Sequence, residues 1–294
     1  MASCLLAMAC GSDGDGEGGG PFGGGGFGAG LNGGGSSAAG GSIGVVTPPT
    51  GPLDGTPGIF GSYALGEPVT GTTAIANAPS EDGCGSIITG IVRDFKDTHP
   101  DFESFTGNGE KGIVRAELGD DLKPVYASAT VTTFTTGKDN FDQWYRHVPG
   151  VNEPYLVHVE LVENEDDNVH TFHSDDFFPL DGAGFGDQDR AHNFHFTTEF
   201  HTEFVYSGGE TFRFTGDDDL WVFINDRLAI DLGGLHPEQS ASVDLDEHAA
   251  TLGISRGGTY RLSLFHAERH TEHSNFRIDT SLHFVNCGSV PVVR

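Results

Sequence analysis

Alternation of apolar and polar residues with a period of two is the sequence feature that most constrains this fold. In residues 193–206, NFHFTTEFHTEFVY, every second residue from Phe194 to Phe204 falls on one face of an extended chain, and the histidines and glutamates fall on the other. The stretches TFRFT, TYRLSLF and NFRIDTSLHF alternate in the same way. Because a helix requires a period of 3.6, these segments predict β-strands.

The stretch Leu220–Ile224, LWVFI, is apolar at every position, which is typical of a central strand covered on both faces. Glycine-rich turn sequences, SGG, LGG and RGG, separate the alternating runs. Many short strands with such turns predict an all-β fold, an antiparallel β-sandwich with few short helices. One helix is expected at residues 139–147, with Asp139 as its N-cap.

Composition divides the chain into four parts. Residues 1–10 resemble the apolar end of a secretion signal, and LAMAC resembles a bacterial lipobox with Cys10 as the lipidated residue; a plain cleaved signal is the alternative. Residues 11–83, rich in Gly, Ser and Pro, are expected to form a flexible, disordered tether. Residues 84–287 would form the sandwich and 288–294 a tail. We therefore expect a secreted or cell-surface protein, a probable bacterial lipoprotein in this interpretation.

Two of the four cysteines bracket the expected sandwich. Cys84 and Cys287 enclose a long stretch that contains no other cysteine. In an exported protein this arrangement favours one disulfide between the first and last strands, and two free thiols are the alternative. Such a bridge requires the ends of the domain to be neighbours.

The charge of the chain excludes one class of partner. A formal net charge of −28 argues against nucleic acid, because a phosphate-binding surface needs clustered Lys and Arg. It also argues against electrostatic binding to an anionic membrane, which leaves membrane contact only through a lipid anchor. A strongly acidic surface is compatible with divalent cations, with neutral ligands such as sugars, or simply with solubility.

Three consecutive carboxylates, Asp217, Asp218 and Asp219, stand directly before the most apolar strand. At a half-buried strand end their mutual repulsion grows, because the effective dielectric constant falls. Three interpretations are open: a Ca²⁺ site, since this ion binds six to eight oxygen ligands; a catalytic carboxylate pair; or a solvated turn. The glycine runs lie in the tether, without the flanking strand and helix of a phosphate-binding loop, so we do not expect an enzyme.

Several blocks in order give the chain a family resemblance. HNFHFTTEF, GGETFRFTGDDDLWVFINDRLAIDLGGLHP and YRLSLFHAERHTEHSNFRI resemble the fibro-slime domain, a branch of the PA14 β-sandwich superfamily. The earlier blocks GIVRDFKDTHPDFE and FFPLDGAGFG resemble it too, so the likeness covers residues 86–286. It implies an extracellular, calcium-dependent binding, adhesion or matrix module that recognises carbohydrate or another extracellular polymer. A structural surface module and a carboxylate-dependent polysaccharide hydrolase are the alternatives.

The resemblance also implies site residues. Sugar-binding PA14 domains hold calcium through two adjacent aspartates, which match Asp217 and Asp218 here, and take further ligands from a second loop, expected at residues 266–276. Asp219 would be a secondary ligand, together with two oxygen-bearing residues of that loop, Glu268 and Asn275. The further ligand-binding candidates are Asp231, His236, His266 and Arg269. Fourteen histidines raise the possibility of zinc, but the strand positions of His192 and His195 point them to opposite faces, so zinc is not expected.

Overall fold

The structure, a computed structural model, describes residues 44–46, 49, 53–69, 73–75, 86–164, 168–286 and 288, all within the compact unit Gly41–Arg294. The first strands in chain order are β1 (Gly44–Val46), β2 (Thr56–Pro57), β3 (Ser62–Pro68), β4 (Thr73–Ile75), β5 (Ile87–Phe95), β6 (Asn152–Glu160), β7 (Val162–Asn164) and β8 (Val169–Ser174). The later strands are β9 (Phe196–Val205), β10 (Thr211–Gly216), β11 (Asp219–Ile224), β12 (Arg227–Leu232), β13 (Gln239–Asp244), β14 (Thr259–Glu268), β15 (Phe276–Thr280) and β16 (Phe284–Asn286). The helices are α1 (Lys138–Phe141) and α2 (Leu245–Leu252).

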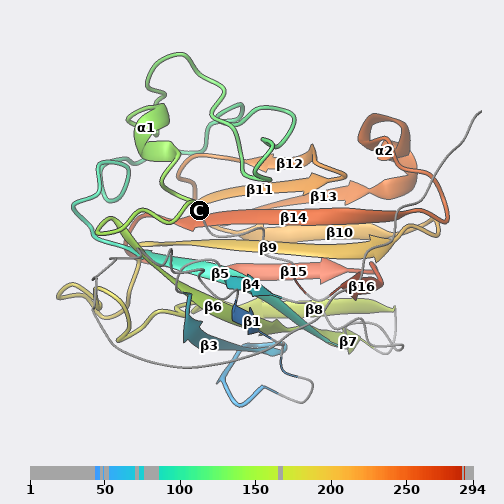
Figure 1. Ribbon diagram of the computed structural model, residues 1–294, viewed down its shortest axis with the longest axis horizontal. Coiled ribbons are helices and arrows are strands. Elements are labelled where there is room, and N and C mark those ends of the chain that lie inside the picture. Colours follow the sequence, from blue (N-terminus) through green and yellow to red (C-terminus); the bar gives the residue numbers. More distant parts are fainter. Residues whose placement is uncertain are drawn as a thin grey trace, which may run out of the picture. The chain divides into compact units, whose positions relative to one another are not determined.

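Two antiparallel sheets form the body of the domain (Figure 1). The larger sheet has the order β12-β11-β14-β9-β5-β6-β3-β2, and β16 pairs with β9 beside this path. The smaller sheet has the order β13-β10-β15-β8-β7. A separate parallel pair joins β1 to β4. The predicted all-β, antiparallel sandwich is therefore confirmed.

The alternating residues of the strands form the core between the two sheets. The buried residues of this core include Phe196, Phe200 and Phe204 of β9, Phe212 and Phe214 of β10, Leu220, Val222 and Ile224 of β11, and Phe276 and Ile278 of β15. Phe276 packs edge-on against Phe214, with ring centroids 5.0 Å apart. Burying a phenylalanine or leucine side chain stabilises a fold by about 1.5–3 kcal/mol, so this apolar face accounts for the sandwich.

A second layer covers the opposite face of the larger sheet. It consists of residues 98–147, which we call the cover segment, and Figure 1 shows its loops and α1 beside β11 and β12. The segment bonds to the edge of the sheet: Leu228 N–H donates to Ala116 O (2.9 Å) and Leu118 N–H to Asp226 O (3.0 Å). Its core buries Ile113, Val114, Tyr126, Phe141, Trp144, Tyr145, Trp221, Phe223, Phe265 and Ala267.

The cover segment explains the doubly apolar strand β11. Trp221 and Phe223 pack under the segment, whereas the alternate residues of the strand, Leu220, Val222 and Ile224, face the other sheet. The expectation of two covered faces is confirmed, and β11 is an interior strand of the sheet, paired with β12 on one side and with β14 on the other. One face of β11 is buried by the other sheet and the opposite face by the loops of the cover segment.

Charged residues are buried under the same segment. Glu199, on the polar face of β9, pairs with Arg93 (2.8 Å), Lys123 and His201 (3.0 Å), and all four side chains are buried. Burial lowers the pKa of Lys123 to about 8, although Glu199 opposes the shift. The polar side of the predicted strand is thus an internal surface, which alternation alone did not reveal.

The helices differ from the prediction. The expected helix at 139–147 is only the four-residue α1, and its N-cap is Gly137 rather than Asp139, without a side-chain hydrogen bond. The sequence analysis missed α2, where Asp244 accepts hydrogen bonds from Asp246 N–H and Glu247 N–H and Gly253 ends the helix with φ 69°. An Asp cap followed three residues later by Glu, with a terminal Gly, was the available signal.

Some strand boundaries also differ from the prediction. β14 runs on to Glu268, so the expected loop at 266–276 begins with three strand residues, and the last predicted strand is split into β15 and β16. The proposed lipidation site Cys10 and both cysteines of the expected disulfide, Cys84 and Cys287, lie outside the described residues and stay predictions. Within the described part, no helix has the length and apolar character needed to cross a bilayer.

Candidate functional site

The three aspartates lie at one end of the sandwich, in the turn from β10 to β11. Gly216 ends β10 where a side chain would place its Cβ 2.5 Å from the carbonyl oxygen of Asn275, so glycine is required there. Asp218 has a left-handed backbone, with φ 57°. The next strand, β14, ends beside this turn, since Asp219 pairs with Ala267. The tight turn thus brings consecutive carboxylates against the end of β14; we call this region the acidic corner.

Asp217 is held by the loop between β14 and β15. Its Oδ1 accepts a hydrogen bond from Asn275 N–H (2.6 Å), and its Oδ2 accepts one from Asn275 Nδ2 (3.1 Å). Burial raises the pKa of Asp217, and these two hydrogen bonds oppose the shift. The structure therefore brings together two of the predicted ligands, although the amide group of Asn275 presents a donor, not an acceptor, to the carboxylate.

Asp218 is buried, and one of its carboxylate oxygens has a partner. Its Oδ2 accepts from Arg269 N–H (2.8 Å), and its own N–H donates to His236 O (3.3 Å). Burial raises the pKa of Asp218 to about 7; the Arg269 charge opposes this shift, and the neighbouring Asp219 and Asp217 add to it. Among the described residues, no hydrogen bond reaches Oδ1 of Asp218, which leaves that oxygen for a ligand.

Asp219 has a different role from its two neighbours. Its Oδ1 accepts from Gly234 N–H (2.6 Å), and its Oδ2 accepts from Arg269 Nε (2.7 Å). Arg269 is completely buried and also donates through Nη1 to Asp101 O (2.8 Å) and Phe134 O (2.9 Å). Asp219 and Arg269 therefore form an internal ion pair that ties the corner to the cover segment. Neither is placed as a direct ligand for a bound molecule.

Glu268 is the least satisfied carboxylate of the corner. It is 1% exposed, and its Oε2 has no hydrogen-bond partner. Burial raises its pKa well above the usual value, and the charges of Asp218 and Asp217 raise it further. The three aspartates and Glu268 carry four formal negative charges against the single positive charge of Arg269, so three are uncompensated. A group without a compensating partner is expensive to bury as an anion.

A cavity of about 360 Å³ opens on the corner, and we call it the corner cavity. Asp217 and Asp218 line it, together with the predicted residues His236 and Asn275. The remaining lining residues come from the cover segment, from the β12–β13 link and from the β14–β15 loop: Thr106, Gly107, Leu235, Pro237, Glu238, His270, Thr271, Glu272 and His273. The sequence analysis missed the contribution of the cover segment.

Two predicted ligand-binding residues lie away from this cavity. Asp231 accepts hydrogen bonds from Trp221 Nε1 (3.0 Å), Gly233 N–H (3.2 Å) and Gly112 N–H (2.8 Å), so its carboxylate anchors the cover segment. His266 is fully buried beside the rings of Phe196, Phe214 and Phe276. Burial lowers the pKa of His266 to about 3, so it is a neutral core residue.

The donor set favours calcium over zinc. No group of three or more His, Cys, Asp or Glu side chains in the described part of the chain is arranged to hold a metal ion. A tetrahedral zinc site needs such a group. Calcium also accepts amide and backbone carbonyl oxygens, so two carboxylates with Asn275 and main-chain oxygens suit it. The unpartnered, buried Glu268 Oε2 is the observation in this structure that fits a cation.

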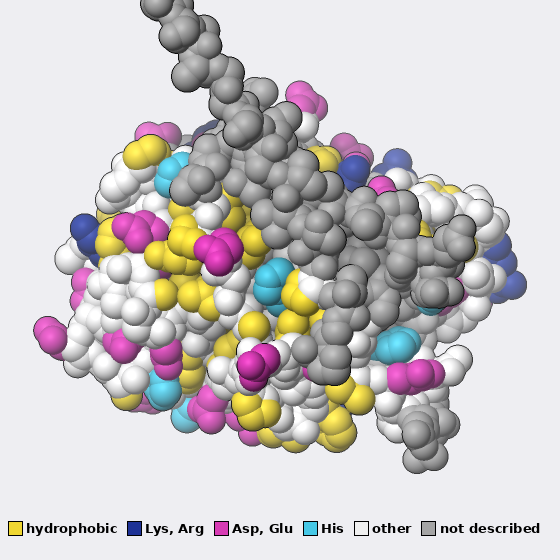
Figure 2. Space-filling model, turned by 60° about the horizontal axis from the view of Figure 1, so that its bottom comes forward, with side chains coloured by type: hydrophobic (Ala, Val, Ile, Leu, Met, Phe, Trp, Pro, Cys, Tyr) yellow, Lys and Arg dark blue, Asp and Glu magenta, His cyan; other side chains and the backbone are white. Residues whose placement is uncertain are grey.

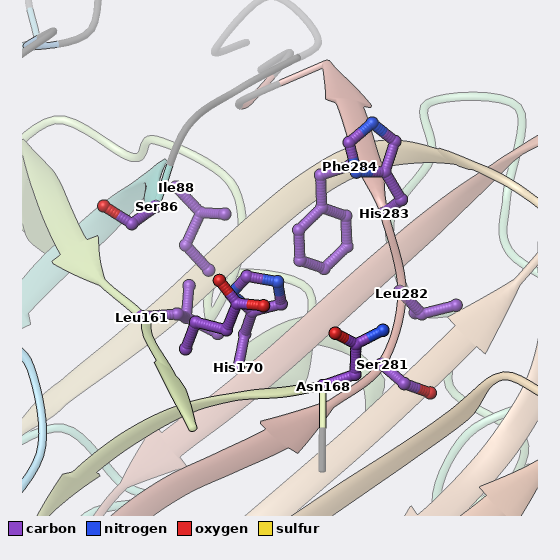
Figure 3. A pocket seen from close by; sticks show the side chains of 10 residues that line it. Ser86, Ile88, Leu161, Asn168, His170, Ser281, Leu282, His283 and Phe284 are labelled. Carbon is purple, nitrogen blue, oxygen red and sulfur yellow. The ribbon is translucent and has the colours of Figure 1, made fainter. Parts of the chain in front are cut away.

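A second cavity, of about 540 Å³, lies at the other end of β9 (Figure 3). In β9, Phe196 pairs with Glu268 of the acidic corner, and Phe204 pairs with Phe284, which lines the second cavity. The two cavities therefore lie near opposite ends of this strand. Figure 3 shows the side chains of Ile88 and Leu161 on one side and the ring of Phe284 on the other. Ile88, Leu161 and Leu282 of its lining belong to the core between the sheets, and the other lining residues are polar or only partly buried.

Comparison with known proteins finds one matching family model and several similar curated proteins. Residues 160–289 match the family model of the PA14 domain. Among curated proteins, the chain is 41% identical to protein psiR of Dictyostelium discoideum over 206 residues, which cover 63% of this chain and 20% of psiR. It is 40% identical to psiJ over 229 residues (68% and 31%) and 37% identical to psiD over 208 residues (66% and 39%), both of the same organism. The chain thus spans well under half the length of these relatives.

Solved structures give only distant likenesses. The PA14 domain of the MpAFP antifreeze protein aligns with 10% identity and a TM-score of 0.29, covering 74% of this chain and 95% of that domain. A β-glucosidase from Kluyveromyces marxianus, in complex with glucose, aligns with 13% identity and a TM-score of 0.27, covering 72% of this chain and 19% of the enzyme. The family-model match at residues 160–289 supports the PA14 part of the resemblance, and its fibro-slime part stays a prediction.

Proposed function

We propose that this domain is a calcium-dependent binding module for carbohydrate or another extracellular polymer. PA14 domains serve as carbohydrate-binding or adhesion modules, and residues 160–289 match that family. The observation that carries the calcium part is Glu268, a buried carboxylate with an unpartnered oxygen beside Asp217 and Asp218. A divalent cation would offset the charge that Arg269 leaves uncompensated. Secretion and a lipid anchor at Cys10 are part of the same proposal.

The proposed ligands are the side chains nearest the cavity. Asp217 and Asp218, which line the cavity, would bind the ion, and the ion would offset the charge of the buried Glu268 without a direct bond. Asn275 would hold Asp217 in place through two hydrogen bonds. Bound calcium would supply a Lewis-acidic centre for sugar hydroxyls, whereas Asp219 would stay paired with Arg269. The cavity of about 360 Å³ falls in the range of small-ligand sites.

Thermal unfolding tests the calcium proposal. Calcium at 100 times its dissociation constant should stabilise the protein by about 2.7 kcal/mol relative to the chelated protein, because only the folded state holds the site. Calcium should not stabilise the double variant Asp217→Asn/Asp218→Asn. Glu268→Gln should be at least as stable as the parent in chelator, since it removes a buried acid without a partner, but should respond less to calcium. Equal melting temperatures of the parent with calcium and with chelator would refute the proposal.

A polysaccharide hydrolase is the second candidate, favoured by one observation. Burial raises the pKa of Asp218 to about 7, and a carboxyl group protonated near neutral pH can act as a general acid. Release of reducing ends from a polysaccharide, lost in Asp218→Asn, would favour the enzyme. Binding without cleavage would favour the module.

A further inference from the structure

The lining of the corner cavity contains acidic side chains but no Lys or Arg. Four of its residues are carboxylic acids, and none is Lys or Arg. The acids Asp217 and Asp218 lie on the floor, while Glu238 and Glu272 come from the β12–β13 link and from the β14–β15 loop. Calcium on the floor would offset two of the four formal charges, so two negative charges would still face a ligand.

The two outer carboxylates are free to bind a ligand. Glu238 and Glu272 are both exposed, and neither takes part in a hydrogen bond or an ion pair among the described residues. Arg277 acts on Glu238 only from beyond ion-pair distance, and its guanidinium donates to Asp279 at 2.8 Å through both Nε and Nη2. Glu272 has φ 134°, a conformation that side-chain-bearing residues rarely adopt.

Three histidines also line the cavity: His236, His270 and His273. His236 Nδ1 and Nε2 lie 2.9 and 3.2 Å from the carbonyl oxygens of Pro237 and Leu232, so the backbone holds this ring in place. His270 Nδ1 lies 2.9 Å from Thr271 O, so its N–H is directed to the backbone.

We infer that the corner cavity binds an amino sugar, with saccharide hydroxyls directed to the calcium and a protonated amine directed to Glu238 or Glu272. This inference rests on the proposed function and narrows its ligand class. A neutral sugar would donate hydrogen bonds to the two outer carboxylates but would gain no charge attraction from them, and an acidic sugar would be repelled. Specificity is a difference between affinities, and the lining supplies both an attractive and a repulsive contribution.

Because the whole protein surface is acidic, the test of amino-sugar binding needs short ligands. Figure 2 shows acidic side chains scattered over one face, with few basic ones, so a long polycation would bind anywhere on such a protein. The probes are therefore trisaccharides: glucosamine, N-acetylglucosamine and galacturonic acid, each titrated calorimetrically into the full chain at pH 6.5 and 0.15 M salt, with calcium or with chelator.

The glucosamine trisaccharide should bind about fivefold more tightly than its N-acetyl form, because two exposed ion pairs contribute modestly at this ionic strength. The galacturonic trisaccharide should bind most weakly. Glu238→Gln/Glu272→Gln should remove the preference for the amine and leave N-acetylglucosamine binding unchanged. The matched control Glu163→Gln/Glu247→Gln removes the same charge from exposed sites elsewhere. It should still prefer the amine over the N-acetyl form.

Three results would overturn the inference. Equal or tighter binding of the N-acetyl form, with calcium dependence retained, would reject the amino sugar and leave the proposed function intact. Binding of the glucosamine trisaccharide that is unchanged in chelator would place it on the general acidic surface. Failure of every trisaccharide to bind a protein that still binds calcium would reject both this inference and the carbohydrate part of the proposed function.

Discussion

Replacing Arg269 with glutamine is expected to lower the free energy of unfolding by about 3–5 kcal/mol, the usual effect of removing one partner from a buried ion pair. The guanidinium is completely buried, pairs with Asp219, and donates to Asp101 O and Phe134 O. It also lies 4.5 Å above the ring of Trp144. The substitution would leave Asp219 charged without its partner and would detach the cover segment from the corner.

Two further variants make this result specific. Arg269→Gln/Asp219→Asn removes both charges, so it should recover much of the lost stability, because no unpaired charge stays buried. Arg256→Gln removes an exposed arginine paired with Asp246 and should change stability little. Urea unfolding at fixed calcium measures all three. A single Arg269 variant as stable as the Arg256 variant would contradict the ion-pair assignment.

Without calcium, the contribution of Asp218 to stability should fall as the pH rises from about 4 to above 7. The pKa of Asp218 is raised from 3.8 to about 7, so the folded state binds a proton more tightly than the unfolded state. The stability that this proton supplies is present below the unfolded pKa and is lost as the pH passes the folded pKa. Three pKa units correspond to about 4 kcal/mol at most.

The comparison of parent and Asp218→Asn isolates this contribution. Burial also raises the pKa of Asp94 to about 7. Because Asp94 is present in both proteins, its effect on stability cancels when the parent is compared with the variant. The parent should lose more stability than the variant between pH 5 and pH 8 in chelator, and calcium should reduce the difference, because it replaces the proton. Chemical denaturation at each pH measures both slopes. Parallel pH profiles in chelator would show that Asp218 titrates normally.

The sandwich could be predicted because its core depends on a local pattern. Phe196, Phe200 and Phe204 alternate along one strand, and the structure places all three between the sheets. The other face of that strand could not be predicted, because Glu199 meets Arg93 and Lys123 from distant parts of the chain. Polar alternation is the same whether the polar face meets water or buried charges.

The acidic corner was predictable in position and less so in detail. Asp217 and Asp218 line the corner cavity, and their role as calcium ligands stays a prediction. Asp219 does not line this cavity, since the side chain that neutralises it belongs to Arg269, fifty positions along the sequence. Glu268 was expected in a loop but ends a strand, which buries it. Such roles follow from tertiary contacts between β11, β14 and the cover segment, which leave no local periodicity.

Calcium stoichiometry tests the central claim most directly: that buried carboxylates at the end of β11 are stable together because a divalent cation lies among them. The purified chain is first dialysed against millimolar calcium and then against calcium-free buffer. It should either retain one calcium ion for each chain or bind one again when calcium is added back in equilibrium dialysis. Asp217→Asn/Asp218→Asn should bind none at the same concentration. No bound calcium in the parent, or equal binding by the parent and the double variant, would contradict the account.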